Sequence, residues 1–195
     1  MGKRVVYFAT GNREKLREVT DILQGYPLMI EQVDAKGVEI QSNSIEEIAK
    51  ESATTAAQRT NLPVFVEDTG LFIQGLNGFP GPYAAYVHRT IGLRGVLALM
   101  ENAPTREAYF LSAVAFAAPE IKSVVFTGKA PGRIAASARG SGGFGYDPIF
   151  EPEGGGGRTF GEMSLVEKNR LSHRALAVRK FAEWYVSRLG DDKGR

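Results

Sequence analysis

Apolar runs alternate with helically spaced segments through the first 68 residues of the chain. Residues 5–9, residues 28–33 and the stretch from residue 64 are apolar and typical of strands. Apolar residues recur at helical spacing over residues 16–23. A second helix is expected over residues 45–59, starting at the capping box of Ser44 to Glu47. Because strands that alternate with helices pair in parallel, the sequence predicts an α/β layer with parallel strands.

The middle of the chain predicts a change to antiparallel pairing. Residues 71–82 are rich in glycine and proline and predict a shaped loop or short hairpin. A helix over residues 83–100 follows, with a break near residues 92–95. Two β-rich segments, residues 108–117 and 123–134, are separated by a short turn and can pair antiparallel. We therefore expect a mixed sheet.

The C-terminal part predicts a long amphipathic helix and a charged, frayed end over residues 190–195. The four glycines at residues 154–157 predict a flexible surface loop. We find no repeat and no long linker, so we expect one domain over residues 1–195. The apolar stripe of the last helix comprises Leu171, Ala175, Val178, Ala182 and Tyr185.

Composition excludes several classes of protein. The 195 residues carry 24 basic and 22 acidic side chains, a formal net charge of +2, which indicates no nucleic-acid polymer or anionic membrane as partner. The absence of cysteine removes disulfides, zinc-thiolate sites and thiol nucleophiles. No apolar run approaches the roughly 18 residues of a membrane span, and the first run is too short for a signal peptide. We expect a cytoplasmic protein.

Two adjacent carboxylates, Glu67 and Asp68, follow the third apolar run and precede Thr69 and Gly70. Successive strand residues point to opposite faces, so both carboxylates can face one ligand only if the chain turns between them. Because Thr69 and Gly70 favour a bend, we expect Asp68 to lie exposed at a strand end and to carry the chemistry. A solvated acidic pair that opens a turn is the alternative.

Residues 10–15, with the sequence TGNREK, lie where the first strand gives way to the first helix. Asn12 is a natural N-cap, yet Lys15 and Arg17 place cations in turns where the helix dipole disfavours them. A bound anion would reverse that effect, and Gly11 allows close approach to the amide groups of the helix start. The segment predicts a phosphate cradle, or otherwise a capped surface helix with scattered charge.

Residues 141–148, with the sequence SGGFGYDP, combine glycines with two aromatic side chains. Glycines let a flat ligand approach the backbone, and Phe144 or Tyr146 could stack on a nucleobase. The segment predicts a base-binding loop, or a hairpin whose aromatic rings fill the core.

Residues 164–174, with the sequence SLVEKNRLSHR, begin with a capping-box pattern, and Ser172 could cap a second helix. His173 and Arg174 would suit hydrogen bonds to an acceptor-rich base edge, and Lys168 would suit phosphate. A solvated basic helix face is the alternative.

Glu39 lies in a polar segment ahead of the second predicted helix. Two or three carboxylates, together with water and phosphate oxygens, suit Mg²⁺. Glu39 is therefore a candidate metal ligand beside Asp68.

These motifs together resemble the inosine triphosphate pyrophosphatase family, the non-canonical purine nucleoside triphosphate pyrophosphatases. The matching blocks keep their order between residue 5 and about residue 189, and the ordered set is far more specific than any block alone. The blocks are Thr10-Gly11-Asn12-x-x-Lys15, Glu67-Asp68-Thr69-Gly70-Leu71, Gly78-Phe79-Pro80-Gly81-Pro82-Tyr83, Phe144-Gly145-Tyr146-Asp147-Pro148, and Glu162-Met163 through Glu167-Lys168-Asn169 to Ser172-His173-Arg174.

The resemblance implies an elongated, two-lobed mixed α/β fold around a long central sheet, with the substrate in a cleft between the lobes. It implies Mg²⁺-dependent hydrolysis of ITP, dITP and XTP at the α–β phosphoanhydride, which yields the monophosphate and pyrophosphate and clears deaminated purines from the nucleotide pool. The implied partners are a small nucleotide and a second copy of the chain in a homodimer, with no nucleic-acid polymer and no membrane.

The resemblance also implies roles for individual residues. Asp68 would be the general base for water and would hold the metal with Glu39, while Glu67 would support the metal site or serve the fold. Many members carry a lysine where this chain has Ser52, which affects one phosphate contact and not the reaction class. The implied substrate-binding residues are Thr10, Gly11, Asn12, Lys15, Thr69, Phe144, Gly145, Tyr146, Asp147, Lys168, His173 and Arg174.

Selectivity is expected to arise from donors of His173, Arg174 and the backbone that meet the 6-oxo group of the base, because adenine's amino group would leave such donors unpaired. Two other functions stay open. One is the same hydrolysis of other modified or pyrimidine nucleotides. The other is a nucleotide-binding regulatory module without hydrolysis, against which Asp68 and Glu39 argue.

Overall fold

The computed structural model of the chain describes residues 4–35 and 40–191. The chain divides into two compact units that are interleaved in sequence. The first unit comprises Met1–Asp68, Ala113–Gly128 and Arg174–Arg195, and the second comprises Thr69–Ser112 and Lys129–His173.

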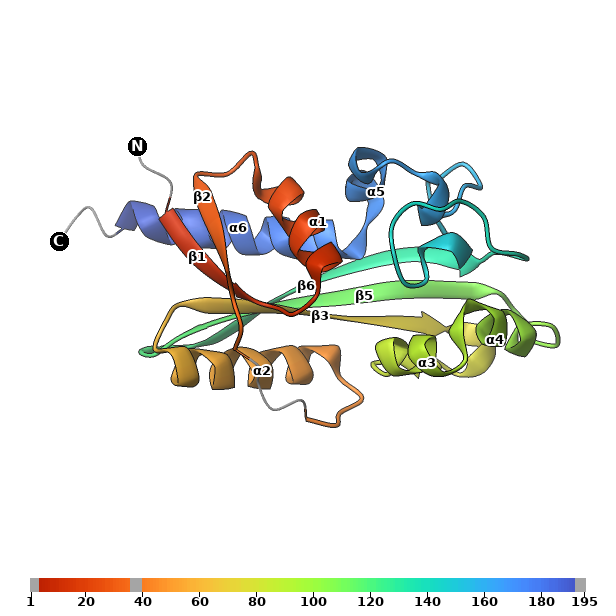
Figure 1. The fold of residues 1–195 in the computed structure, drawn as a ribbon, viewed down its shortest axis with the longest axis horizontal. Coiled ribbons are helices and arrows are strands. Elements are labelled where there is room, and N and C mark those ends of the chain that lie inside the picture. Colours follow the sequence, from red (N-terminus) through yellow and green to blue (C-terminus); the bar gives the residue numbers. More distant parts are fainter. Residues whose placement is uncertain (1–3, 36–39, 192–195) are drawn as a thin grey trace. The chain divides into compact units, whose positions relative to one another are not determined.

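Within the described residues the strands form one sheet in the order β2-β1-β3-β5-β6-β7, and the short β4 also pairs with β3 (Figure 1). Strand β1 pairs in parallel with β2 and β3, whereas β3–β4 and β6–β7 are antiparallel. The predicted mixed sheet is confirmed. The strands are β1 (Arg4–Ala9), β2 (Leu28–Val33), β3 (Val64–Ile73), β4 (Pro80–Gly81), β5 (Glu107–Ala118), β6 (Ile121–Ile134) and β7 (Phe150–Pro152).

The helices begin and end at residues whose side chains or backbone explain the boundary. Asn12 caps α1, Ser44 caps α2, and Asn61 ends α2 in the left-handed conformation. Gly92, at a φ of +63°, separates α3 from α4, so the predicted break in this helical segment is confirmed. The helices are α1 (Arg13–Leu23), α2 (Ile45–Thr60), α3 (Ala84–Thr90), α4 (Gly92–Leu99), α5 (Leu165–Leu171) and α6 (His173–Asp191).

Three short 3₁₀ turns complete the described elements: Gln74–Leu76, Asp147–Ile149 and Phe160–Glu162. Helix α6 ends at Asp191 and so includes the first two residues of the segment predicted to be frayed. Residues 192–195 of that segment lie outside the described residues. Over residues 4–35 and 40–191, every helix falls short of the length and apolarity that crossing a membrane requires.

The first unit is layered, with α1 and α6 on one face of its strands and α2 on the other (Figure 1). Phe8 of β1 and Phe65 of β3 stack at 4.5 Å between ring centroids, and Phe181 of α6 lies 4.8 Å from Phe65. These buried rings join the two adjacent strands to α6. On the other face, α2 contributes a buried stripe of small residues, Ala49, Ala53, Ala56 and Ala57.

The predicted stripe of the last helix needs one correction. Ala175, Val178 and Ala182 are buried on α6 as expected. Leu171, however, ends α5 and packs against the core of the second unit. The reason is that Ser172 adopts an extended backbone between the two helices, so the helical period does not continue across it.

The core of the second unit is aromatic. Phe110 of β5 meets Phe150 at 4.6 Å in an edge-on arrangement, and Phe160 lies 5.4 Å from Phe150. Arg106 closes one edge of this unit, because its guanidinium donates to the carbonyls of Ile134 and Ala135 at 2.7 and 2.6 Å. Charge-assisted bonds of this kind hold the start of β5 to the end of β6.

Strand β3 differs from the prediction at the acidic pair. It does not bend at Thr69 and Gly70 but continues to Ile73, so Asp68 lies within the strand and not at its end. The apolar residues beyond Gly70 explain the difference, because Leu71 and Ile73 are buried and β4 pairs alongside. Glu67 and Asp68 therefore point to opposite faces of the sheet.

Candidate functional site

The residues predicted to contact phosphate form an ordered turn at the start of α1. The Asn12 side chain accepts hydrogen bonds from the backbone N–H groups of Glu14 and Lys15 at 2.9 and 3.1 Å. Thr10 accepts from the Asn12 N–H at 3.2 Å, and Gly11 has open space where a side chain would stand. The backbone is thus preformed and accessible, as the predicted phosphate cradle requires.

Lys15 connects this turn to the acidic pair. Its Nζ donates to the backbone carbonyl of Glu67 at 2.7 Å and lies 2.9 Å from the Glu67 carboxylate. Because Glu67 immediately precedes Asp68 in β3, the cation of the predicted cradle lies one residue from the predicted catalytic acid.

Glu67 belongs to a buried chain of charges. The Arg174 guanidinium, at the start of α6, lies 3.3 Å from the Glu67 carboxylate and 2.5 Å from the carboxylate of Glu18 on α1. The side chains of all three residues are at most 4% exposed. Two cations and two anions, counting Lys15, thereby neutralise one another, as buried charges must. This arrangement gives Glu67 a structural role.

Sequence reasoning missed Glu18. The one local signal is its spacing of three residues from Lys15, which places both side chains on one side of α1 beside the buried Val19. The partner that explains its burial, Arg174, is 156 residues away in sequence.

Asp68 is separated from this chain of charges by the pleat of the strand. Glu67 shares a face with Phe65, toward α1 and α6, whereas Asp68 shares the face of Val66. Asp68 is half-buried, whereas the Glu67 side chain is fully buried.

The second unit holds a cluster of predicted substrate-binding residues, among them Lys168, which is predicted to contact phosphate. Lys168 of α5 donates to Asp147 at 2.5 Å, and both side chains are almost fully buried. The same Asp147 oxygen accepts from the backbone N–H of Phe144 at 2.7 Å, and the Lys168 ammonium lies 5.1 Å from the Phe144 ring centroid. Gly143 is required here, because a side chain at this residue would lie 1.9 Å from the Asp147 carboxylate.

The two aromatic residues of this loop have different environments. Tyr146 is buried in the core, and its hydroxyl donates to the Ala84 carbonyl at 2.9 Å. Burial raises the pKa of Tyr146 to about 12. Phe144 is half-buried, and Gly145 beside it has open space and a φ of +62°. A flat ligand can therefore reach Phe144 and Gly145, whereas the Tyr146 ring fills the core, as the alternative prediction for this loop expects.

His173 is the last residue of the second unit along the chain. Its ring is 2% exposed and stacks on Phe110 at 4.4 Å between centroids. Thr69, the predicted contact after Asp68, is half-buried in the same unit. The predicted residues therefore fall into two groups. Thr10, Gly11, Asn12, Lys15, Asp68 and Arg174 belong to the first unit, and Thr69, Phe144, Gly145, Tyr146, Asp147, Lys168 and His173 to the second.

The predicted metal ligand Glu39 lies outside the described residues. Among residues 4–35 and 40–191, no three His, Asp or Glu side chains are grouped as a metal site. Mg²⁺ commonly takes one or two carboxylates and completes its shell with water and phosphate oxygens. A single carboxylate such as that of the half-buried Asp68 fits that requirement, whereas the Glu67 carboxylate is held by Lys15 and Arg174.

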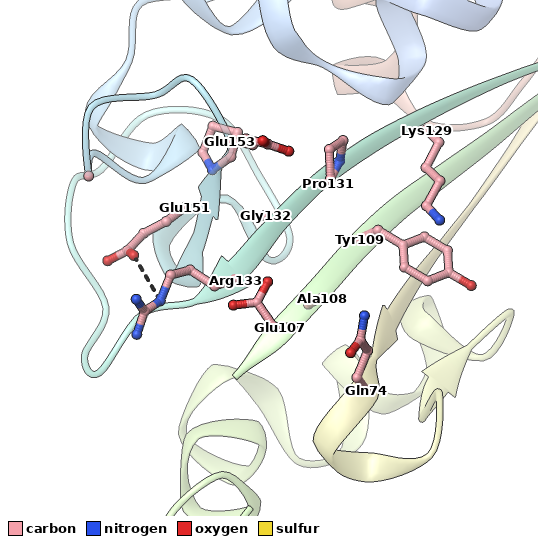
Figure 2. A pocket seen from close by; sticks show the side chains of 12 residues that line it. Gln74, Glu107, Ala108, Tyr109, Lys129, Pro131, Gly132, Arg133, Glu151 and Glu153 are labelled. Atoms are coloured by element: carbon pink, nitrogen blue, oxygen red, sulfur yellow. Dashed lines mark ion pairs between the residues drawn. The ribbon is translucent and has the colours of Figure 1, made fainter. Parts of the chain in front are cut away.

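A groove of about 430 Å³ in the second unit lies apart from the predicted residues. Figure 2 shows Lys129 beside Tyr109, with its Nζ 3.9 Å from the ring centroid, and Arg133 paired with Glu151 at 3.5 Å. Glu107 and Glu153 add carboxylates to the lining, so its charges are mixed. None of the residues assigned to phosphate, metal or base lines this groove.

Comparison with known proteins identifies the class of protein to which this fold and these residues belong. Residues 6–184 match the model of the Ham1 family, so the chain belongs to the Ham1 family. The predicted resemblance is thereby confirmed.

The relatives are similar over nearly their whole length. The dITP/XTP pyrophosphatase of Methanopyrus kandleri is 51% identical over 184 residues, covering 94% of this chain and 97% of its own. The protein of the same name from Methanothermobacter marburgensis is 50% identical over 181 residues, covering 93% and 96%. Among solved structures, a HAM1 protein from Coxiella burnetii superposes with a TM-score of 0.82 at 29% identity, covering 94% of this chain and 99% of its own.

Proposed function

We propose that the chain is a nucleoside triphosphate pyrophosphatase that hydrolyses ITP, dITP and XTP to the monophosphate and pyrophosphate, with Mg²⁺ as cofactor. The names of the relatives support the substrate class. The observation that carries the proposal is the placement of Lys15 at 2.7 Å from the Glu67 carbonyl, because it brings the phosphate turn of α1 to the residue before Asp68.

The proposed reaction uses the predicted residues as follows. Water attacks the α-phosphorus, Asp68 accepts the water proton, and the bond between the α-phosphorus and the bridging oxygen breaks to release pyrophosphate. Lys15 and the backbone of Thr10 to Asn12 orient the triphosphate and offset its charge. Asp68 and Glu39 would hold Mg²⁺, which supplies further neutralisation of the phosphate charge.

Base recognition belongs to the residues of the second unit in this proposal. Phe144 and Gly145 offer a face on which a purine can stack. His173 is a donor suited to a 6-oxo acceptor. Adenine presents an amino group at that position, which would leave a buried donor without an acceptor and would disfavour ATP. The Asp147 carboxylate orients Lys168, which is predicted to contact phosphate. Arg174, the other predicted donor to the base, is engaged with Glu18 and Glu67.

The homodimer and the cytoplasmic location are also part of this proposal. The family resemblance supports the homodimer, and the lack of cysteine is compatible with a reducing compartment. Analytical ultracentrifugation of the purified chain tests the dimer directly, and a single species at the monomer mass would contradict it.

The decisive experiment measures products. The wild-type protein is incubated with ITP, XTP, GTP and ATP, with and without Mg²⁺, and monophosphate and pyrophosphate are quantified. We expect Asp68→Asn to lower kcat by about 10²-fold or more, because the general base is lost. The exposed Asp34 of the same unit provides the control Asp34→Asn, which should retain wild-type turnover.

Two outcomes would contradict the assignment. Near-normal turnover of Asp68→Asn, with an unchanged circular dichroism spectrum, would exclude Asp68 as the base. Stabilisation of the wild-type protein by ITP without any release of pyrophosphate would instead indicate a nucleotide-binding regulatory module.

A further inference from the structure

Arg139 lies outside every predicted motif, yet both its backbone groups hold the loop that carries Phe144 to Asp147. Its N–H donates to the Pro148 carbonyl at 2.8 Å, directly after that loop. Its carbonyl accepts from the Thr159 hydroxyl, also at 2.8 Å. Arg139 thus joins the end of the loop to the segment that begins at Thr159.

The Arg139 side chain adds three contacts to the same region. Its Nη2 donates to Glu151 at 2.9 Å and to the Gly157 carbonyl at 2.6 Å, and its Nε donates to Glu162 at 3.1 Å. The planar guanidinium can serve these acceptors together, which an ammonium group cannot. The glycine turn at residues 154–157 is thereby tied to the loop.

The backbone between these anchors is packed without room for side chains. A side chain at Gly161 would lie 2.8 Å from the Arg139 carbonyl and 2.9 Å from the Pro148 Cα. The Gly142 N–H donates to the Gly161 carbonyl at 2.8 Å. The loop therefore packs directly against residues 159–162, and its conformation depends on that contact.

The charges around Arg139 are coupled. The hydrogen bonds that Arg139 donates to Glu151, and then to Glu162, raise the pKa of Arg139. The Thr159 N–H lowers the pKa of Glu162 most, and Arg139 lowers it further. Removal of the guanidinium would leave the Glu151 and Glu162 carboxylates without the cation between them. Their repulsion would then displace the loop from residues 159–162.

We propose that Arg139 is a positioning residue that sets the conformation of the base-recognition loop, residues 144–147, without touching the nucleotide. The inference rests on the proposed function, because it assigns that loop to the purine. Phe144 is held by its N–H bond to Asp147, and Asp147 also holds Lys168, so a displaced loop moves the stacking ring and the predicted phosphate contact together.

The test compares Arg139→Gln, Arg139→Lys and the control Arg133→Gln. Arg133 pairs with the same Glu151, at 3.5 Å, but lies on the exposed side of β6. For Arg139→Gln we expect the KM for ITP to rise about tenfold while kcat changes less than about threefold, since the chemistry at Asp68 is untouched. Arg139→Lys should recover part of the KM, and Arg133→Gln should match the wild type.

Hydrogen exchange of the ligand-free proteins provides a readout besides activity. The Gly142 and Phe144 amides should exchange faster in Arg139→Gln, and at the wild-type rate in Arg133→Gln. All variants are measured well below their unfolding temperatures. Exchange in β5 is the control for global unfolding, because a global loss of structure would make the β5 amides exchange faster as well.

Unchanged exchange at these amides, or a fall confined to kcat, would overturn the inference. Equal effects from Arg133→Gln would overturn it too, because the loss of any Glu151 partner would then suffice. If the wild-type protein releases pyrophosphate from no nucleotide, the proposed function fails. The exchange data still decide whether Arg139 holds the loop.

Discussion

At the scale of single residues, Glu67 and Asp68 lie on opposite faces of β3 and have different environments. Glu67 is enclosed between Lys15 and Arg174, and its carboxylate neutralises both. Asp68 points to the opposite face and is half-buried. The pleat of one strand therefore gives two neighbouring acids different environments, and the catalytic role that we propose falls to Asp68.

Replacement of Glu67 should show the structural role. Glu67→Gln leaves two cations beside a neutral amide, and breaking a buried ion pair in this way costs about 3–5 kcal/mol. We expect urea denaturation to give that loss of unfolding free energy. Glu14→Gln, which removes an exposed pair with Arg17 at 3.9 Å, should change it by less than about 0.5 kcal/mol. Equal stability of the two variants would argue against the charge chain.

At the scale of elements, α5 is held at its start by a complete capping box. The Ser164 hydroxyl accepts from the Glu167 N–H, and the Glu167 carboxylate accepts from the Ser164 N–H at 2.9 Å. The hydrogen bond from the Ser164 N–H lowers the pKa of Glu167 most, to about 2, followed by the Ser164 hydroxyl, which donates to the carboxylate at 2.8 Å, and by Arg158. The cap positions the helix that carries Lys168.

This capping box should make the free energy of unfolding depend on pH in the acidic range. The Glu167 carboxylate binds protons more weakly in the folded state, so its contribution is complete above its ordinary pKa of 4.5 and is lost as pH falls toward about 2. We expect Glu167→Gln to lower the urea midpoint at pH 7, and the difference from wild type to vanish near pH 2.

Arg158→Gln separates the two sources of this effect. It removes the ion pair with Glu167 at 3.0 Å but leaves the capping box intact. Arg158→Gln should therefore lower the urea midpoint less than Glu167→Gln does, and its stability should keep most of the dependence on pH. A constant difference between Glu167→Gln and wild type across this pH range would refute the assignment.

At the scale of the whole molecule, the division into two compact units does not coincide with breaks in secondary structure. Strands β3, β5 and β6 each run from one unit into the other. A strand whose ends belong to different units cannot unfold at one end without losing backbone hydrogen bonds along its length.

We therefore expect the units to unfold together. Differential scanning calorimetry should show one transition, with a calorimetric enthalpy equal to the van't Hoff enthalpy and roughly 0.7 kcal/mol per residue. Two resolved transitions would show that the units are independent in stability despite the shared strands.

The prediction of elements from sequence succeeded where the determining interactions are local. The alternation of strands and helices, the caps at Asn12 and Ser44, and the break at Gly92 all depend on residues a few positions apart. The bend after Asp68 was predicted by the same local logic and was wrong, because burial of Leu71 and Ile73 outweighs the turn preference of Thr69 and Gly70.

The sequence by itself determined the order of elements, the mixed sheet and the family, because periodicity, capping and ordered motifs are written in neighbouring residues. Only the tertiary structure decided which charges meet. Glu18 pairs with Arg174 across 156 residues and Lys168 with Asp147 across 21, and it is Phe144 rather than Tyr146 that stays accessible. These outcomes depend on which distant segments the fold brings into contact, since a buried charge is stable only beside a partner of opposite charge.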